Sequence, residues 1–383
     1  MERFYFDHAA TTPLHPEAAA AMLDVMQGPP GNASSIHSFG REARRVVNAA
    51  RERIAGTLGC RPDEVIFTSG GTESNNTALT GVMAALRRSG KNHIVTTAIE
   101  HHAVLNVCEK LEREGVKVTY VPVDSAGRVS ADDIAGAIGP DTGVVSVMYG
   151  NNETGTIQPI EEIGLAAEAA GVLLHVDAVQ AYGKVAIDLQ QLPVHMLTVS
   201  SHKINGPQGI GALYVKKGTP YYPLLFGGLQ ERKRRGGTEN VAGIAGFGKA
   251  AEICAAELES RKLLWDKLRL YWIERMRRAA GDDISINGHE LYRLPHIVNI
   301  SFTGIDTESM LMNLDLAGIA ASGGSACTAG ALEPSHVLRA MGVPDSLLQS
   351  AVRFSFGLGN TLEELEQAAG KVETFLRRVR TTK

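Results

Sequence analysis

The chain has 383 residues, of which 44% are hydrophobic, and its formal net charge is -4. This length and apolar content are enough to fill the cores of about two domains. The small net charge argues against nucleic acid or an anionic membrane as the main partner, and no segment reaches the roughly 18 uncharged apolar residues of a membrane span. The N-terminus has no apolar signal region. We therefore predict a cytoplasmic enzyme that acts on a small molecule.

Short β-rich runs alternate with helical patterns between about residues 60 and 215. A strand at 64–68 precedes a helix at 72–88, and further strands are predicted at 93–97, 116–121, 143–148, 172–176, 196–199 and 211–215. Such alternation predicts crossover units and a largely parallel sheet covered by helices. Ligands of such sheets bind at the carboxyl ends of the strands.

The pattern changes in the last third of the chain. One long charged helical stretch, predicted over 241–280, would form a spine between domains. A smaller α+β domain is then indicated by strands at 297–302, 319–321 and 352–356 and by helices near 308–314 and 334–341. We expect a large domain over residues 14–250, and a small domain made of residues 1–13 together with 251–383.

The segment Ser69-Gly70-Gly71-Thr72-Glu73 lies between a predicted strand and a helix. Free backbone N–H groups and the helix dipole favour an anion there, and glycine permits its close approach. A phosphate is the expected ligand. An ordinary tight turn capped by Thr72 is the alternative.

Two further strand ends carry charged residues. Lys203, in Ser200-Ser201-His202-Lys203, is placed to hold a cofactor aldehyde as a Schiff base, although most lysines are merely solvated. Asp177 ends an apolar strand, where a buried carboxylate needs a cation or several donors. The protonated pyridine nitrogen of pyridoxal phosphate is such a cation; a simple turn cap is the alternative. Gln180, three residues later, could reach a ring hydroxyl.

Other polar residues are placed near predicted strands. His101 or His102 offers an imidazole that could stack on a flat cofactor and move protons. The polar loop over residues 149–155 could contact a cofactor or substrate, or be a simple turn. Arg353 interrupts an apolar strand pattern and could clamp a carboxylate, unless it faces outward from an edge strand. The basic run at 232–235 is more typical of a solvated or phosphate-facing loop than of a nucleic-acid site.

The four cysteines, Cys60, Cys108, Cys254 and Cys327, are scattered, with no C-x-x-C pair and no His–Cys cluster at metal-ligand spacing. We therefore expect neither a disulfide scaffold nor a metal site. Cys327 alone is surrounded by small residues, over 321–330, which leave its thiol little apolar shielding. This pattern predicts an exposed nucleophile on a mobile loop rather than a structural cysteine.

Taken together, these motifs resemble the pyridoxal-phosphate cysteine desulfurases of the NifS/IscS class, in the class V aminotransferase family. The likeness runs nearly end to end, through residues 7–13, 68–75, 100–101, 151–153, 175–180, 201–203, 235–238 and 325–328. It implies fold type I of the pyridoxal-phosphate-dependent transferases, with a mainly parallel seven-stranded sheet in the large domain. It also implies a homodimer.

The resemblance implies a role for each matched residue. Lys203 would hold pyridoxal 5'-phosphate and exchange a proton with the substrate, and Cys327 would take the sulfur of L-cysteine as a persulfide, leaving L-alanine. The cofactor and substrate would be held by the following residues: Gly71, Thr72, Ser200 and His202 at the phosphate, Thr238 at the phosphate of the neighbouring subunit, Asp177 at the pyridine nitrogen, Gln180 at the ring hydroxyl, His101 stacked on the ring as a further catalytic residue, and Asn152 and Arg353 at the cofactor and the substrate carboxylate.

The match to the family has departures. Residues 226–231 are less rich in histidine than in the housekeeping iron–sulfur enzymes, and the chain ends soon after its last helix. The sulfur-acceptor protein is therefore expected to be either an iron–sulfur scaffold or a tRNA-thiolating enzyme. A selenocysteine lyase or an aminotransferase with the same cofactor is the nearest alternative function. A cofactor-less scaffold or nucleic-acid-binding protein that uses residues 232–235 is a more distant one.

Overall fold

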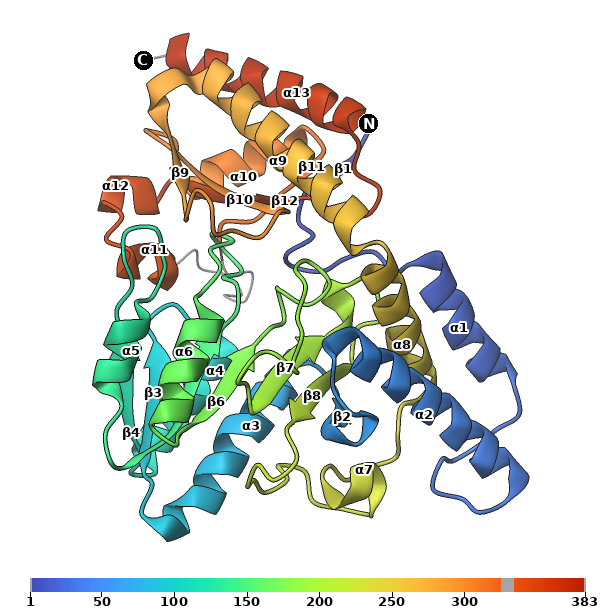
Figure 1. Cartoon of the computed structure of the whole chain (residues 1–383). Coiled ribbons are helices and arrows are strands. Elements are labelled where there is room, and N and C mark those ends of the chain that lie inside the picture. Colours follow the sequence, from blue (N-terminus) through green and yellow to red (C-terminus); the bar gives the residue numbers. More distant parts are fainter. Residues whose placement is uncertain (1, 325–333, 382–383) are drawn as a thin grey trace.

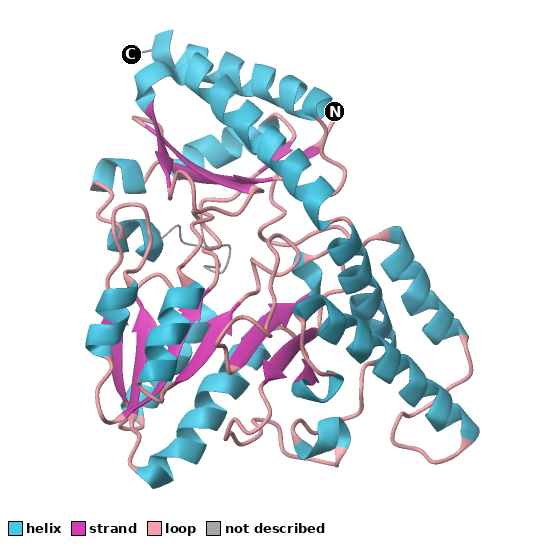
Figure 2. Cartoon of the chain, in the orientation of Figure 1, coloured by secondary structure: helices cyan, strands magenta, loops and turns pink. Residues whose placement is uncertain are grey.

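The computed structural model describes residues 2–324 and 334–381 (Figure 1). A seven-stranded sheet with helices on both faces forms the larger part, and a small sheet under two long helices lies above it in the view of Figure 2. Each part has its own apolar core. The predicted α/β class is confirmed.

The large sheet has the strand order β2-β8-β7-β6-β5-β3-β4. Of its seven strands, β8 alone runs in the opposite direction to the others. The predicted, largely parallel, seven-stranded sheet is therefore confirmed. The strands are β2 (Val65–Thr68), β3 (His93–Thr97), β4 (Lys117–Val121), β5 (Thr142–Met148), β6 (Leu173–Asp177), β7 (Met196–Ser200) and β8 (Gly211–Val215).

Helices cover both faces of this sheet. On one face pack α3 (Gly71–Leu86) and α4 (His102–Arg113). The other face carries α2 (Ser38–Leu58), α5 (Ala131–Ala137), α6 (Ile160–Ala169) and α8 (Val241–Ala256), with α1 (Pro16–Gln27) against α8. Because both faces are covered, β2, β3, β5, β7 and β8 are buried throughout, which explains their nearly continuous apolar sequences.

The small sheet is antiparallel, with the order β12-β10-β9. Its core includes Phe6, whose ring lies 5.3 Å from Trp272 and 5.4 Å from Phe356. The N-terminal segment thus packs with the C-terminal third of the chain. The elements here are β1 (Phe4–Tyr5), α9 (Leu258–Ala280), β9 (Ile284–Asn287), β10 (Ile297–Phe302), α10 (Thr307–Leu316), β11 (Ile319–Ala320), α11 (His336–Ala340), α12 (Asp345–Leu348), β12 (Ala351–Ser355) and α13 (Leu362–Thr381).

The long helix predicted over 241–280 is two helices. Glu257 (φ -103°, ψ 7°) separates α8 from α9. The break lets α8 pack on α1 and α2 while α9 packs against α13. The domain boundaries at residues 13/14 and 250/251 stay a prediction; α8 runs through the second of them. Among the described residues, none of the helices combines the length and apolar character needed to cross a bilayer.

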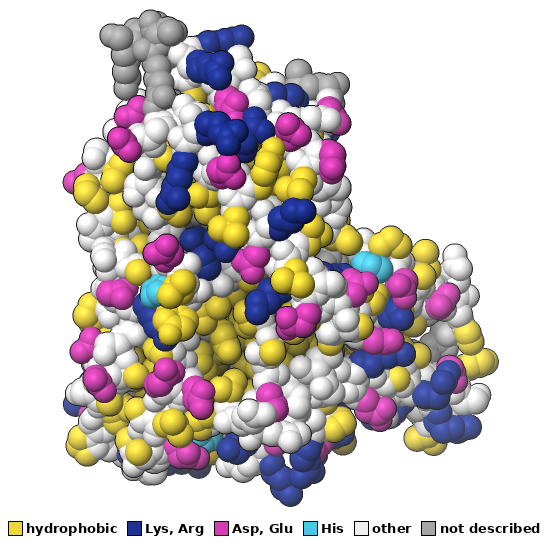
Figure 3. Space-filling model, turned by 45° about the horizontal axis from the view of Figure 1, so that its top comes forward, with side chains coloured by type: hydrophobic (Ala, Val, Ile, Leu, Met, Phe, Trp, Pro, Cys, Tyr) yellow, Lys and Arg dark blue, Asp and Glu magenta, His cyan; other side chains and the backbone are white. Residues whose placement is uncertain are grey.

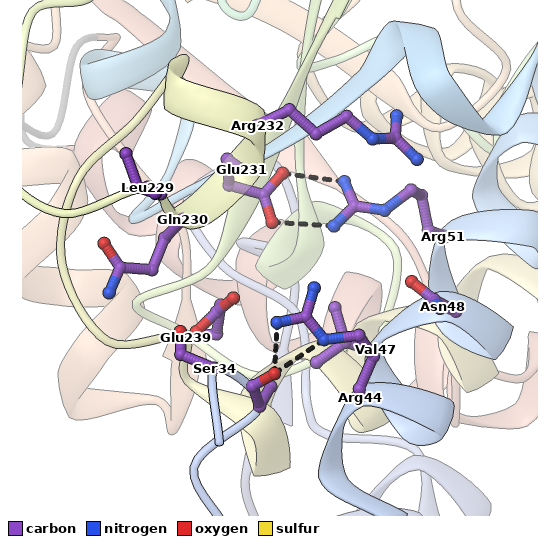
Figure 4. Close-up of a pocket in the computed structure, with 11 residues that line it drawn as sticks. Ser34, Arg44, Val47, Asn48, Arg51, Leu229, Gln230, Glu231, Arg232 and Glu239 are labelled. Atoms are coloured by element: carbon purple, nitrogen blue, oxygen red, sulfur yellow. Dashed lines mark hydrogen bonds and ion pairs between the residues drawn. The ribbon is translucent and has the colours of Figure 1, made fainter. Parts of the chain in front are cut away.

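A strained turn lies next to β2. Three successive residues of α7 (Gln230–Lys233), namely Glu231, Arg232 and Lys233, have φ of 43°, 58° and 68°. Left-handed backbone costs such residues roughly 1–2 kcal/mol each. The buried Glu231 carboxylate offsets this cost: it accepts two 2.7 Å bonds from Arg51 and one of 3.1 Å from the Phe67 N–H (Figure 4).

The buried ion pair between Arg51 and Glu231 is expected to stabilise the fold. Glu231→Gln leaves the Arg51 charge buried without an anion, so we expect the free energy of unfolding to fall by about 3 kcal/mol. Urea unfolding measures this. Glu42→Gln is the control, because it removes the exposed partner of Arg45 and should leave the unfolding curve unchanged. Equal urea midpoints for Glu231→Gln and wild type would contradict the prediction.

Candidate functional site

A cavity of about 250 Å³ lies at the carboxyl ends of β5, β6 and β7, and the N-terminal segment and β12 contribute to its lining. Ten of the twelve residues predicted from the sequence line it: Gly71, Thr72, His101, Asn152, Asp177, Gln180, Ser200, His202, Lys203 and Arg353. Thr238 lines a separate cavity, and Cys327 lies outside the described residues. Residues up to 282 positions apart (353 - 71) therefore meet in one place.

Lys203 enters the cavity from a short 3-10 turn, Ser201–Lys203, that follows β7. Its Nζ donates to the carbonyl oxygens of Ala9 (2.6 Å) and Ala10 (2.7 Å). The Ala9 carbonyl also accepts a 2.9 Å bond from Gln180 Nε2. The N-terminal segment thus orients two of the predicted cofactor residues at once.

Asp177 ends β6 and is only 6% exposed. Its carboxylate accepts bonds from Asn75 Nδ2 (2.7 Å) and from the Val179 N–H (3.0 Å). Both donors are neutral, so the site suits an additional cationic partner such as a protonated ring nitrogen. Asn75, on α3, was not predicted from the sequence, since nothing in its local pattern points to a residue 102 positions away.

The loop before α3 forms a cradle for an anion. Gly70 has φ 154°, and the helix begins at Gly71 without a side-chain cap, so its first N–H groups are available. A Cβ on Gly71 would lie 2.7 Å from Val179 Cγ2, which leaves room for glycine alone. Burial, and after it the charge of Lys203, lower the pKa of His202, beside this loop, to about 4. A neutral imidazole and free N–H groups fit a phosphate.

Of the two adjacent histidines, His101 lines the cavity, while His102 packs against His336, with 4.8 Å between ring centroids. His101 precedes α4 and caps it, because its Nδ1 accepts a 3.0 Å bond from the Ala103 N–H. Burial lowers the pKa of His101. This position agrees with the choice of His101 that the resemblance implies, and its role at the cofactor stays a prediction.

Arg353 is only 2% exposed, so it is not an outward-facing edge arginine. Its Nη2 pairs with Asp7 Oδ1 at 2.8 Å, and its Nη1 donates to the Asn152 carbonyl at 2.8 Å. Asn152 therefore meets Arg353 through its backbone.

Glu100 is a buried acid next to the site that sequence analysis did not single out. Its Oε1 accepts bonds from Thr97 Oγ1 (2.6 Å) and the Met148 N–H (3.0 Å), while Oε2 has no partner among the described residues. Burial raises its pKa to about 8. The carboxyl group is therefore largely protonated at neutral pH.

Glu100 predicts a pH-dependent loss of stability. The unfolded chain ionises it near its ordinary pKa of 4.5 and the folded chain only near 8, so folding loses stability as the pH rises between these values. Glu100→Gln cannot ionise. We expect its urea midpoint, measured without cofactor, to rise relative to the urea midpoint of wild type between pH 5 and pH 8. Glu109 is exposed on α4, so the urea midpoint of Glu109→Gln should differ from that of wild type by the same amount at every pH. A difference between Glu100→Gln and wild type that stays constant with pH would contradict this explanation.

The comparisons with known proteins agree with this geometry. Residues 4–368 match the family model of aminotransferase class-V. The chain is 48% identical to the "Putative cysteine desulfurase IscS 1" of Bacillus subtilis, over 99% of this chain and 100% of that protein. It is 46% identical to the "Cysteine desulfurase IscS" of Dictyoglomus turgidum, over 98% and 95%.

Solved structures show the same likeness. A "NIFS-like protein" superposes with a TM-score of 0.93 at 38% identity, over 98% of this chain and 100% of that one. "SspA in complex with cysteine" superposes with a TM-score of 0.82 at 35% identity, over 93% and 99%. The predicted fold type is confirmed. The chain belongs to the NifS/IscS class of the class-V aminotransferase family.

Proposed function

We propose that the protein is a pyridoxal-phosphate-dependent cysteine desulfurase, which converts L-cysteine to L-alanine and transfers the sulfur to Cys327 as a persulfide. The observation that carries the proposal is the meeting of ten predicted residues in one cavity of about 250 Å³. Relatives named as cysteine desulfurases support it, as does the similar solved structure of SspA in complex with cysteine. They do not favour a selenocysteine lyase or an aminotransferase.

The described residues fit the cofactor. Gly71 and Thr72 at the start of α3, with Ser200 and His202, would hold its phosphate, and Asp177 would hold the ring nitrogen. When bound, pyridoxal phosphate withdraws electrons from the substrate Cα and so allows the carbon–sulfur bond to break.

The remaining residues would act on the substrate. Lys203 would take the proton from Cα and return it, and His101 would stack on the ring and could give or take a proton. Arg353, near Asn152, would hold the carboxylate, and Gln180 would hold the ring hydroxyl.

Cys327 is proposed as the sulfur acceptor on the strength of its sequence context and of the other thiols. Burial raises the pKa of Cys60 and Cys108 to about 12, and that of Cys254 to about 11. A thiolate is the nucleophile in sulfur transfer, so these three are poorly suited to it.

We also propose a homodimer. Thr238 is exposed and lines a small cavity beside Arg235 rather than the Lys203 cavity of its own chain, so it would be free to reach a neighbouring subunit. The acceptor protein would serve iron–sulfur assembly or tRNA thiolation. The cytoplasmic location stays a prediction.

Two arginines of the basic run at 232–235 make contacts within the fold, which argues against a nucleic-acid-binding surface. Arg235 pairs with Glu73 at 2.9 Å, and Arg234 contacts the Asp63 carbonyl. On the face shown in Figure 3, basic and acidic side chains are interspersed. This arrangement gives little support to nucleic-acid binding.

Lys203→Ala tests the cofactor assignment. We expect the purified variant to lack the yellow absorbance of the bound aldehyde, because Lys203 is the only lysine among the described residues that line the cavity. Absorbance spectroscopy after incubation with pyridoxal phosphate measures this. Lys216→Ala, exposed just after β8, is the control and should stay yellow. A colourless wild-type protein would refute the proposed function.

Cys327→Ser tests the sulfur transfer. We expect the variant to bind cofactor normally but to form no persulfide, with alanine production near background. Peptide mass spectrometry after incubation with L-cysteine locates the sulfur, and Cys60→Ser serves as the matched control, which should react like wild type. Sulfur on Cys60, Cys108 or Cys254, or a keto acid in place of alanine, is the result that would refute the assignment.

A further inference from the structure

Asp7 contacts a residue of the proposed site without lining the cavity itself. It follows β1, and its neighbours are tied to the end of β12. The Ser355 N–H donates to the Phe6 carbonyl at 2.8 Å, and the Ala9 N–H donates to Ser355 Oγ at 2.8 Å. The backbone on both sides of Asp7 is thus held beside the strand that carries Arg353.

Both oxygens of the Asp7 carboxylate are used. Oδ1 pairs with Arg353 Nη2 at 2.8 Å, and Oδ2 accepts a 2.9 Å bond from Ser322 Oγ. Ser322 in turn exchanges two backbone bonds with Arg353, of 2.6 and 3.1 Å. The three residues therefore form a closed ring of interactions, in which the guanidinium cannot turn without breaking a bond.

Arg353 keeps donors for a ligand. A guanidinium has five N–H donors, and the bonds to Asp7 and to the Asn152 carbonyl use one on Nη2 and one on Nη1. Its Nε, buried, has no partner among the described residues. Because Arg353 lines the cavity, the second N–H of Nη1 and of Nη2 would be the donors for a carboxylate there.

Fixed orientation matters for such a contact. A two-bond contact between a guanidinium and a carboxylate depends on the plane of the guanidinium, so a side chain held in advance loses less entropy on binding. Asp7 also provides an anion for a guanidinium that is 2% exposed, whose burial would otherwise be costly.

We propose that Asp7 is a positioning residue: by joining Arg353 and Ser322, it holds the guanidinium at the angle that meets the α-carboxylate of the substrate. This inference rests on the proposed function, which assigns that carboxylate to Arg353. Asp7 acts through Arg353 and touches no reacting atom. A purely structural link between the N-terminal segment and the small sheet is the alternative.

The test compares ligands with and without a carboxylate. L-Alanine and ethylamine differ only by that group, and both can be titrated against the holoenzyme through the visible absorbance of the cofactor. We expect Asp7→Ala to weaken the binding of L-alanine by about tenfold, which is the loss of affinity that one hydrogen bond to a charged group produces. Ethylamine should bind as to wild type. With L-cysteine, KM should rise more than kcat falls.

Asp7→Asn is the conservative variant. Its amide oxygen can still accept from Arg353 Nη2, and its amide N–H can donate to the Ser322 hydroxyl, so we expect L-alanine affinity close to wild type. Equal weakening of both ligands by Asp7→Ala would show general structural damage and overturn the inference. Unchanged L-alanine affinity in Asp7→Ala, or an equal loss in Asp7→Asn, would also overturn it.

Arg353→Ala separates this inference from the proposed function. If Arg353→Ala weakens L-alanine selectively and Asp7→Ala does not, the inference about Asp7 alone fails. If Arg353→Ala has no selective effect, the carboxylate is held elsewhere, and the Arg353 assignment and the Asp7 inference fail together. Cofactor absorbance and the melting temperature of each variant show that it is folded and loaded.

Discussion

Four neighbouring parallel strands, β3, β5, β6 and β7, end at the same edge of the large sheet, and the proposed site depends on that edge. Parallel strands place the residues that follow them side by side, however long the crossovers between them are. His101, Asn152 and Lys203 follow β3, β5 and β7, and Asp177 is the last residue of β6. Helices on both faces bury the strands, so their ends are held rigidly enough to orient a cofactor.

The sheet edge by itself is only half of the site. The N-terminal segment supplies the carbonyl groups that accept hydrogen bonds from Lys203 and Gln180. It also supplies Asp7, which pairs with Arg353. The same segment places Phe6 in the core of the small sheet. The cavity therefore lies where the two cores meet, and packing in the small core helps to hold the residues that close the cavity.

Burial decides which groups of the site carry charge. It lowers the pKa of His202 and of His175, which lies under the site, to about 4, and raises that of Glu100 to about 8. These groups are then mainly neutral near pH 7. Fewer competing charges in a poorly solvated site strengthen the remaining electrostatic contacts, such as the one between Arg353 and a substrate carboxylate.

The sequence alone determined the parallel sheet, the strand-end motifs and the family, because strand periodicity and glycine-rich turns are local patterns. The structure adds the helices α1 and α2, for which no element was predicted. Only the tertiary structure decided the break at Glu257 and the packing that places His101, and not His102, in the cavity. It also decided that Arg353 is bound by Asp7, 346 positions away. Such pairings depend on how separate elements pack, and local sequence carries no signal for a contact made across the whole chain.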